Sequence, residues 1–534
     1  MGITIRERGQ KVSDCIQNHV KQSVRAIATA TGLSKSSVHR HQQGIERRNQ
    51  HPESDWWETA RGYQWLFRLV YGVVYCFGIK QGVGAETLSE FIQIVHLENH
   101  VASSPSALRD LKKRMTQLII DYGDVQAKHC QPSQGQGIGL GADETFFGLP
   151  VLVLIELASG FIFIETECEN RTYDTWLKQL EQWWNSQQWH CHYLVSDGAR
   201  ALIKLALSGL GCVSVADLFH ALRALGRPMG SALGRQLAQL KKQYDKLQKQ
   251  LKPCSDEAKQ QSLKALIEEN TAQQQRLCED QRTYHDTLEE ISQIIHPFTR
   301  DTQQWRLGEG LANDLAPSLR TLTKLAHSYG KESAQKAIET FQSQIASFAQ
   351  GIEAWRQWVT VTLQAETQDS KLQNWLLSAL LPWVYWLRQA DKTRQPALKK
   401  HYQEAASCAY DLLFEQPLTL TMAPTELERW VLWSQEFCAK YQRTSSAVEG
   451  RNGYLAKLHC AGRGFSEQSL KALTIIHNFD LKRPDGSTAA QRLFGRPFPD
   501  LFEWLLENAD DLPMPRKSSK AQKANPLYTK AVPA

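Results

Sequence analysis

The stretch "GADETFFGLPVLVLIELASGFIFIE", residues 141–165, begins with two neighbouring carboxylates and continues into strongly apolar sequence. Its β-branched and aromatic residues predict a strand over 149–159 that turns back at "ASG" into a strand over 161–169. The preceding segment, 137–147, is a further candidate strand and carries the two carboxylates. Two charges beside a buried sheet are costly unless a cation meets them. The stretch therefore predicts both a sheet and a site at its edge.

The sequence after this stretch alternates between strand and helix patterns. "HCHYLVSDGARALIKLAL", residues 190–207, predicts a strand that ends at Asp197 and then a helix. "CVSVADLFHALRALG", residues 212–226, repeats this pattern with Asp217 at the end of the strand. Three early strands followed by alternating helices and strands predict a mixed sheet covered by helices.

Residues 226–435 contain no convincing strand pattern, and their first part has heptad spacing. Apolar residues at alternating four- and three-residue steps predict an antiparallel coiled-coil hairpin over 233–295. The heptad positions are Leu233, Leu237, Leu240, Tyr244, Leu247 and Leu251 in the first run and Leu263, Ile267, Asn270, Leu277, Tyr284, Leu288, Ile291 and Ile295 in the second. We expect this hairpin to mediate dimerisation or to hold DNA.

The N-terminal segment "SVRAIATATGLSKSSVHRHQQGIERR", residues 23–48, predicts two helices separated by a turn at Gly32, with Ser34 capping the second helix. This pattern is typical of a helix-turn-helix, in which the second helix lies in the major groove of DNA. The alternative is an ordinary helical hairpin with a solvated basic face. The predicted DNA contacts on the second helix are Lys35, Ser36, His39 and Arg40.

The composition indicates a soluble, multi-domain protein. The chain has 534 residues, of which 42% are hydrophobic and 22% charged, and its formal net charge of +6 is compatible with a nucleic-acid partner. Eleven cysteines without a C-x-x-C pair favour a reducing cytoplasm over a disulfide framework. The N-terminus has no apolar leader pattern, and the apolar runs are too short or too interrupted by charge to span a bilayer. We therefore expect a cytoplasmic protein with no membrane partner.

Three carboxylates stand out by their positions. Asp143 and Asp197 lie at the ends of predicted strands, and Glu449 lies on a predicted helix near the C-terminus. Acidic residues at the ends of adjacent strands converge on one edge of a sheet, where their oxygens suit a hard divalent cation such as Mg²⁺. Strand alternation points Glu144 to the face opposite Asp143, so we expect Glu144 to be a bystander. Taken singly, each acid is also consistent with a solvated surface residue.

The order of these motifs resembles the insertion-sequence transposases with an RNase H-like core and an Asp-Asp-Glu triad. The similar segments are "GADETFF", "LVSDGARALI" and "SSAVEGRNGYLAKLHCAGRGFSEQSLKALTIIHNF", with the C-terminal "DGSTAAQRLFGRPFPDLFEWLL". The resemblance implies that Asp143, Asp197 and Glu449 are catalytic and bind two Mg²⁺ (or Mn²⁺) ions. Two such ions activate a nucleophile and stabilise the leaving oxygen in phosphodiester displacement.

A further segment, "VADLFHALRAL", resembles the aspartate-x-x-histidine element that follows the second aspartate in many of these transposases. By this resemblance Asp217 and His220 flank the site, and the alternative for His220 is a core histidine. Arg451 and Lys457, which follow the glutamate on the same predicted helix, are predicted phosphate contacts. The alternative for these basic residues is solvation on a helix surface.

The distance from Asp197 to Glu449 exceeds a minimal core, and related transposases accept a helical insertion there. The predicted fold class is therefore an α/β RNase H-like mixed sheet split by a long all-α insertion with a coiled coil, preceded by a helix-turn-helix. The predicted domains are a helix-turn-helix (1–50), a helical linker domain (51–135), the first part of the catalytic core (136–225), the helical insertion (226–435), the second part of the core (436–505) and a basic disordered tail (506–534).

These features predict a metal-dependent DNA transposase that binds the ends of an insertion sequence and catalyses hydrolysis and strand transfer. Its expected partners are element-end DNA, target DNA and a second copy of the chain, in a bacterial cytoplasm at the nucleoid. The alternatives are a DNA-binding regulator or domesticated transposase without strand transfer, and an RNase H-like nuclease that only cleaves.

Overall fold

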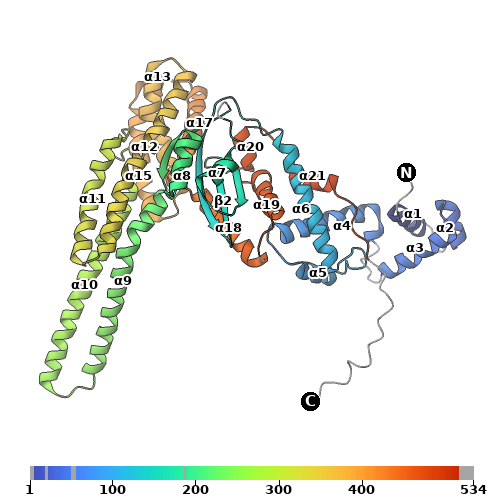
Figure 1. Cartoon of the computed structure of the whole chain (residues 1–534), viewed down its shortest axis with the longest axis horizontal. Coiled ribbons are helices and arrows are strands. Elements are labelled where there is room, and N and C mark those ends of the chain that lie inside the picture. The colour runs from blue at the N-terminus through green and yellow to red at the C-terminus, as the bar shows by residue number, and fades with distance from the viewer. Residues whose placement is uncertain (1–4, 19–21, 50–55, 186–187, 463, 516–534) are drawn as a thin grey trace. The chain divides into compact units, whose positions relative to one another are not determined.

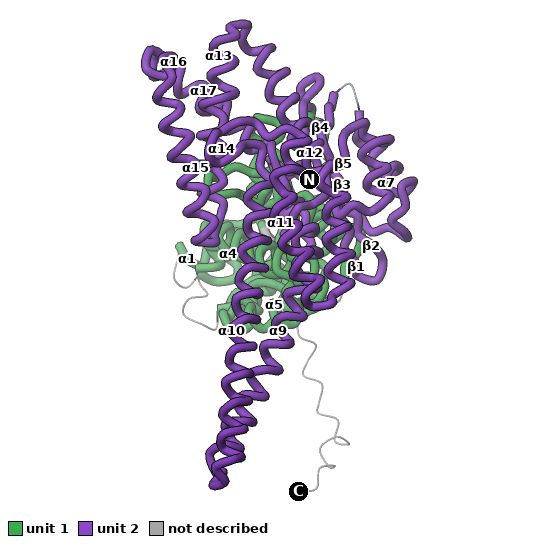
Figure 2. Tube along the Cα trace, turned by 90° about the vertical axis from the view of Figure 1, so that its left-hand side faces the viewer, with its two compact units in different colours: residues 1–131, 453–534 green, residues 132–452 purple. Residues whose placement is uncertain are grey.

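The chain forms two compact units in the computed structural model (Figures 1 and 2). Unit 1 comprises residues 1–131 and 453–534, and unit 2 comprises residues 132–452. The structure describes residues 5–18, 22–49, 56–185, 188–462 and 464–515.

Unit 2 contains a mixed five-stranded sheet in the order β3-β2-β1-β4-β5. The strands are β1 (Gln136–Phe146), β2 (Pro150–Glu156), β3 (Ile162–Glu167), β4 (Trp189–Ser196) and β5 (Val213–Ala216). The first three strands pair antiparallel, whereas β4 and β5 run parallel to β1. The predicted mixed α/β sheet is confirmed. Every residue of β2 is buried, which explains why all of them except Glu156 are apolar.

Short helices connect the strands of the second half of the sheet. They are α7 (Tyr173–Leu180) before β4, and α8 (Arg200–Lys204) with η3 (Leu205–Leu210) between β4 and β5. Such crossovers are what parallel neighbouring strands require.

Long helices follow the sheet, as the heptad pattern predicts. The helices α9 (Leu218–Leu251) and α10 (Glu257–Ile294) form a hairpin that projects from the unit (Figure 1). The buried heptad positions are Leu233, Asn270, Leu277, Tyr284, Ile291 and Ile295. The helix α9 starts directly after β5, so the hairpin is continuous with the sheet and begins eight residues before the predicted boundary at 226.

The remaining insertion helices pack around a large aromatic core. Trp355, Tyr385 and Trp386 are fully buried there. The helices are α11 (Gly308–Ser328), α12 (Glu332–Glu366), α13 (Ser370–Trp375), η4 (Leu376–Leu380), α14 (Leu381–Lys392), α15 (Pro396–Phe414), α16 (Pro417–Thr421) and α17 (Pro424–Lys440). The helix α18 (Ser446–Gly462) then starts in unit 2 and continues past its boundary.

Unit 1 is helical in the residues that the structure describes. Its helices are α1 (Ile5–Asn18), α2 (Val24–Thr31), α3 (Lys35–Arg48), α4 (Ala60–Val73), η2 (Val74–Ile79), α5 (Ala85–Ile94), α6 (Pro105–Ala127), α19 (Glu467–Phe479), α20 (Ala489–Phe494) and α21 (Leu501–Asn508). The two predicted N-terminal helices are present as α2 and α3. Gly32 ends α2 in a left-handed conformation, and the Ser34 hydroxyl accepts a hydrogen bond from Ser37 N.

The C-terminal segment differs from the prediction. Residues 436–505 were expected to complete the sheet domain, but residues 453–505 belong to unit 1, where α19 and α21 pack on α6. A close approach of Gly123 on α6 to Ile475 on α19 illustrates this packing. The predicted tail begins too early, since α21 extends to Asn508 and Leu512 is buried. Its basic residues, Arg516, Lys517, Lys520 and Lys523, lie outside the described residues. No helix among the described residues is long and apolar enough to cross a membrane.

Candidate metal site

Three aspartates lie at the carboxyl ends of the parallel strands of unit 2. Asp143 is near the end of β1, Asp197 follows β4 directly, and Asp217 follows β5 and caps α9. Because β1, β4 and β5 are parallel, these ends share one edge of the sheet. The sheet topology thus brings together acids that are up to 74 residues apart in sequence (217 − 143).

The carboxylates of Asp143, Glu144 and Asp197 form a cluster at this edge. One oxygen from each lies within 4.8 Å of the others. Strand alternation predicted that Glu144 faces away from Asp143, but its carboxylate lies in the same cluster. Strand alternation fixes the direction of the Cα–Cβ bond, but the longer glutamate side chain carries its carboxylate further and can reach around the strand end.

Glu144 is held in this position by two donors. Arg171 Nη1 and Trp176 Nε1 each lie 3.4 Å from a Glu144 carboxylate oxygen. Arg171 also lies over the ring of Phe146, and its side chain is about half exposed. The Arg171 guanidinium therefore lies beside the cluster and is open to solvent.

The charges in the cluster repel one another. Burial, together with the negative charges of Glu449 and Asp197, raises the pKa of Asp143 to about 7, although a backbone hydrogen bond opposes this. Burial and then the charge of Asp197 likewise raise the pKa of Glu144. An acidic oxygen set that is destabilised by its own charge suits a hard divalent cation such as Mg²⁺ or Mn²⁺, which takes oxygen ligands and removes the repulsion.

Glu449 reaches the site from the first turn of α18, but its carboxylate is bound to a histidine. His220 Nε2 lies 3.1 Å from Glu449 Oε1. One turn further along α18, Asn452 Nδ2 donates to Asp143 Oδ2 at 3.0 Å, and Asn452 Oδ1 is buried without a hydrogen-bond partner. Glu449 lies near enough to Asp143 for its charge to raise the Asp143 pKa, but the 4.8 Å cluster of described residues contains Glu144 instead of Glu449.

Asp217 and His220 both lie beside the site. Asp217 is buried and accepts hydrogen bonds from His220 N at 3.0 Å and from Ser445 N at 2.6 Å. The side chain of His220 is 32% exposed and its ring contacts Glu449, so the geometry favours a flanking position over a core histidine.

Arg451 is the predicted DNA contact that the geometry argues against. Its side chain is 4% exposed, and its guanidinium forms a two-pronged ion pair with the carboxylate of Glu165 on β3, with both N···O distances 2.6 Å. A guanidinium buried in this way docks α18 on the sheet and is not presented to DNA. The other predicted contacts, Lys35, Ser36, His39, Arg40 and Lys457, are exposed; the first four lie on α3 and Lys457 on the part of α18 in unit 1.

Sequence reasoning missed Glu144, Asn452 and the Arg451–Glu165 pair. Asn452 was open to prediction, because it lies three residues after Glu449 and hence on a neighbouring part of the same helix face. Glu165 carried a weaker signal, as an acid within the apolar strand "FIFIE". Its partner lies 286 residues away, and no local pattern specifies that partner.

Comparisons with known proteins cover only part of this site. A model described as a family of unknown function, DUF6399, matches residues 376–521. The match includes α14 to α18, and hence Glu449, but none of the strands. The comparisons with curated proteins and with solved structures gave no match. Function therefore has to be inferred from the chemistry of the site.

Proposed function

We propose that the chain is a metal-dependent DNA transposase of the Asp-Asp-Glu type. The observation that carries this proposal is the meeting of Asp143 and Asp197 at one sheet edge with Glu449, which a separate helix delivers. The mixed sheet followed by a long helical insertion supports an RNase H-like core as the finer fold class. The position of α18 against this edge supports the assignment of Glu449 as the third acid.

Two Mg²⁺ or Mn²⁺ ions bound at such a site would activate a water or 3′-hydroxyl and stabilise the leaving oxygen. Asp143, Asp197 and Glu449 would hold the ions, and Glu144 would add an oxygen that the sequence did not indicate. The remaining residues orient these groups, since Asn452 donates to Asp143 and His220 contacts Glu449.

The DNA contacts belong to two places in the chain. Arg171, exposed beside the carboxylates, suits a phosphate next to the reacting one. The exposed polar and basic side chains of α3 (Lys35, Ser36, His39 and Arg40) would bind the element ends as the second helix of a helix-turn-helix. Target DNA would be the second substrate, and the α9–α10 hairpin would join two copies of the chain. This activity belongs in a bacterial cytoplasm, at the nucleoid.

The test is incubation with Mg²⁺ or Mn²⁺ and DNA that carries the sequences flanking the gene. Transposition predicts joined products, which Asp143→Asn and Glu449→Gln abolish. Cleavage without joining would instead identify a nuclease, and specific binding without cleavage would identify a DNA-binding regulator. Activity of Asp143→Asn equal to that of the unchanged protein would refute the site.

A further inference from the structure

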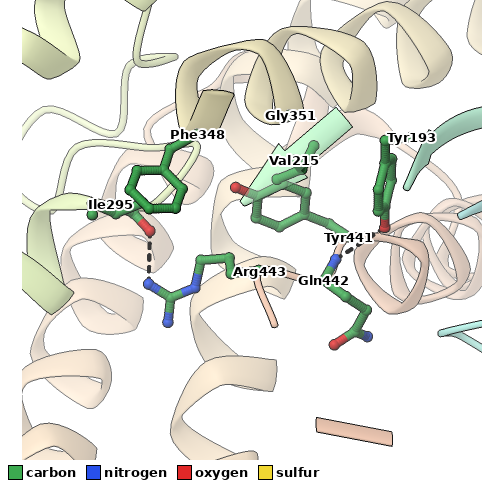
Figure 3. Close-up of a pocket in the computed structure, with 8 residues that line it drawn as sticks. All are labelled: Tyr193, Val215, Ile295, Phe348, Gly351, Tyr441, Gln442 and Arg443. Atoms are coloured by element: carbon green, nitrogen blue, oxygen red, sulfur yellow. Dashed lines mark hydrogen bonds between the residues drawn. The ribbon is translucent and has the colours of Figure 1, made fainter. Parts of the chain in front are cut away.

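The segment just before Glu449 contacts the N-terminal end of α9 and the C-terminal end of α10. Arg443 Nη1 donates to two carbonyl oxygens at the C-terminal end of α10, those of Ser292 at 3.0 Å and Ile295 at 2.6 Å. Figure 3 shows the contact of Arg443 with Ile295. These carbonyls carry the partial negative charge of a helix C-terminus, which a guanidinium stabilises. The carbonyl oxygen of Arg443 in turn accepts from Leu218 N, the first residue of α9, at 3.1 Å.

Ser445 continues this connection into the helix of the glutamate. Its N–H and its hydroxyl both donate to Asp217 Oδ2, on the residue that caps α9. Its carbonyl oxygen accepts from Val448 N at 2.8 Å and Glu449 N at 3.1 Å, which forms the first turn of α18. Ser445 thus links the buried Asp217 carboxylate to the backbone of Glu449 through hydrogen bonds on both sides.

The residues on the other side of Arg443 are also fixed to the sheet. Gln442 N donates to the hydroxyl of Tyr193 on β4 at 3.1 Å, and that hydroxyl donates to the carbonyl of Lys440. The cavity beside them, shown in Figure 3, measures about 10 Å³ and so has room for one water molecule at most. Residues 442–445, the connector between α17 and α18, are therefore held on this side by hydrogen bonds to the sheet.

We propose that Arg443 and Asp217 are positioning residues for Glu449. They clamp residues 443–445 between the end of α10 and the start of α9, and this clamp sets the place of the first turn of α18. A displacement of either helix end moves Glu449 relative to Asp143 and Asp197. The catalytic consequence rests on the proposed function, whereas the clamp itself is a property of the fold.

The experiment compares Arg443→Met, Asp217→Asn and the milder Ser445→Ala in the full-length protein. The matched control is Tyr284→Phe, which removes a buried hydrogen bond between α10 and the Gly226 carbonyl of α9 without touching the connector. Amide hydrogen exchange of residues 446–452 reports on the first turn of α18, and Mn²⁺-dependent cleavage of flanking DNA reports on catalysis.

We expect Arg443→Met and Asp217→Asn to speed amide exchange in 446–452 by about tenfold or more, because an anchor worth about 1.4 kcal/mol is lost. We expect kcat to fall by about 10²-fold with KM for DNA unchanged, as for a misplaced catalytic group. Ser445→Ala should give a smaller change in the same direction, since the Ser445 N–H bond remains. Tyr284→Phe should change neither measurement.

Exchange in 446–452 that is unchanged in all three variants, or raised equally by Tyr284→Phe, would overturn the clamp. A raised KM with unchanged kcat would overturn the positioning role. If Arg443→Met does not fold, Ser445→Ala decides by the same two criteria. If the unchanged protein cleaves no DNA, the proposed function fails, and the exchange measurement still decides whether the clamp holds α18.

Discussion

Two carboxylates on one face of the sheet, the half-buried Asp143 and the buried Glu165, differ in whether a cation balances their charge. Asp143 on β1 pairs with Val153 on β2, and Val153 pairs with Glu165 on β3, so the three side chains form one row across the strands. Glu165 is neutralised by the guanidinium of Arg451. Asp143 accepts hydrogen bonds from the Asn452 amide and from the backbone of Glu144, and burial together with its acidic neighbours raises its pKa to about 7.

The difference separates a carboxylate with a structural role from one whose charge would be balanced by a metal under the proposed function. A buried acid with a guanidinium partner has its charge balanced by the protein. Among the described residues no guanidinium pairs with Asp143, and under the proposed function a divalent cation would supply the balance. Both contacts come from α18, because Arg451 and Asn452 are adjacent in sequence. The ion pair that docks the helix therefore also fixes the groups that face the candidate metal site. Gly141 on β1 permits the close approach of Val448.

The largest expected effect is on catalysis. Asp143→Asn should lower DNA cleavage on the order of 10³-fold or more, because a metal ligand is lost. The metal-free protein should become no less stable, since a repelling charge is removed. Cleavage rates and thermal unfolding measure the two effects. The exposed Asp245→Asn on α9 is the control and should leave both unchanged.

The next largest expected effect is on stability and tests the ion pair between Arg451 and Glu165. Arg451→Met should destabilise unit 2 by about 3–5 kcal/mol, because it leaves the Glu165 carboxylate buried and unpaired. The double variant Arg451→Met/Glu165→Leu should recover most of this loss, and denaturant unfolding measures both. A single variant as stable as the unchanged protein would show that the pair does not dock α18.

A third prediction concerns pH. The pKa of Asp143 in the folded protein is raised from 3.8 to about 7, so its protonated form favours folding and its ionised form opposes it. In the metal-free protein this contribution to stability is fully present below about pH 4 and is lost as the pH rises through 7. Thermal unfolding between pH 4 and pH 8 should show this loss, and Asp143→Asn or added Mn²⁺ should reduce it. The same slope in Asp143→Asn would contradict the assignment.

The smallest expected effect is a pH dependence of stability opposite in sign to that of Asp143. It comes from a histidine in the helical insertion. His296 is fully buried between the hydroxyls of Tyr385 and Tyr402, and burial holds its pKa well below 6.5. Below pH 6.5 the histidine becomes protonated in the unfolded chain but stays neutral in the folded protein. The free energy of unfolding therefore decreases as the pH falls below 6.5. His296→Gln should reduce this loss of stability at acid pH, as measured by unfolding between pH 5 and pH 7. An unchanged pH dependence in the variant would show that other groups cause the loss.

Local pattern predicted much of this molecule. The apolar runs predicted all five strands, and the heptads predicted the α9–α10 hairpin. The positions of Asp143 and Asp197 at strand ends sufficed to place them at one sheet edge, because parallel strands align their carboxyl ends. The pattern did not reveal that residues 453–505 join unit 1, since an amphipathic helix packs on any matching apolar surface.

The sequence by itself determined the elements, their order and the acids at the strand ends, because periodicity and end signals act over a few neighbouring residues. Only the tertiary structure decided which acids receive a balancing charge. Arg451 is assigned to Glu165, Glu144 joins Asp143 and Asp197, and Asp217 holds the start of the helix that carries Glu449. These partners lie far apart in the chain, and the energy of a buried charge depends on what the fold places within a few ångströms of it.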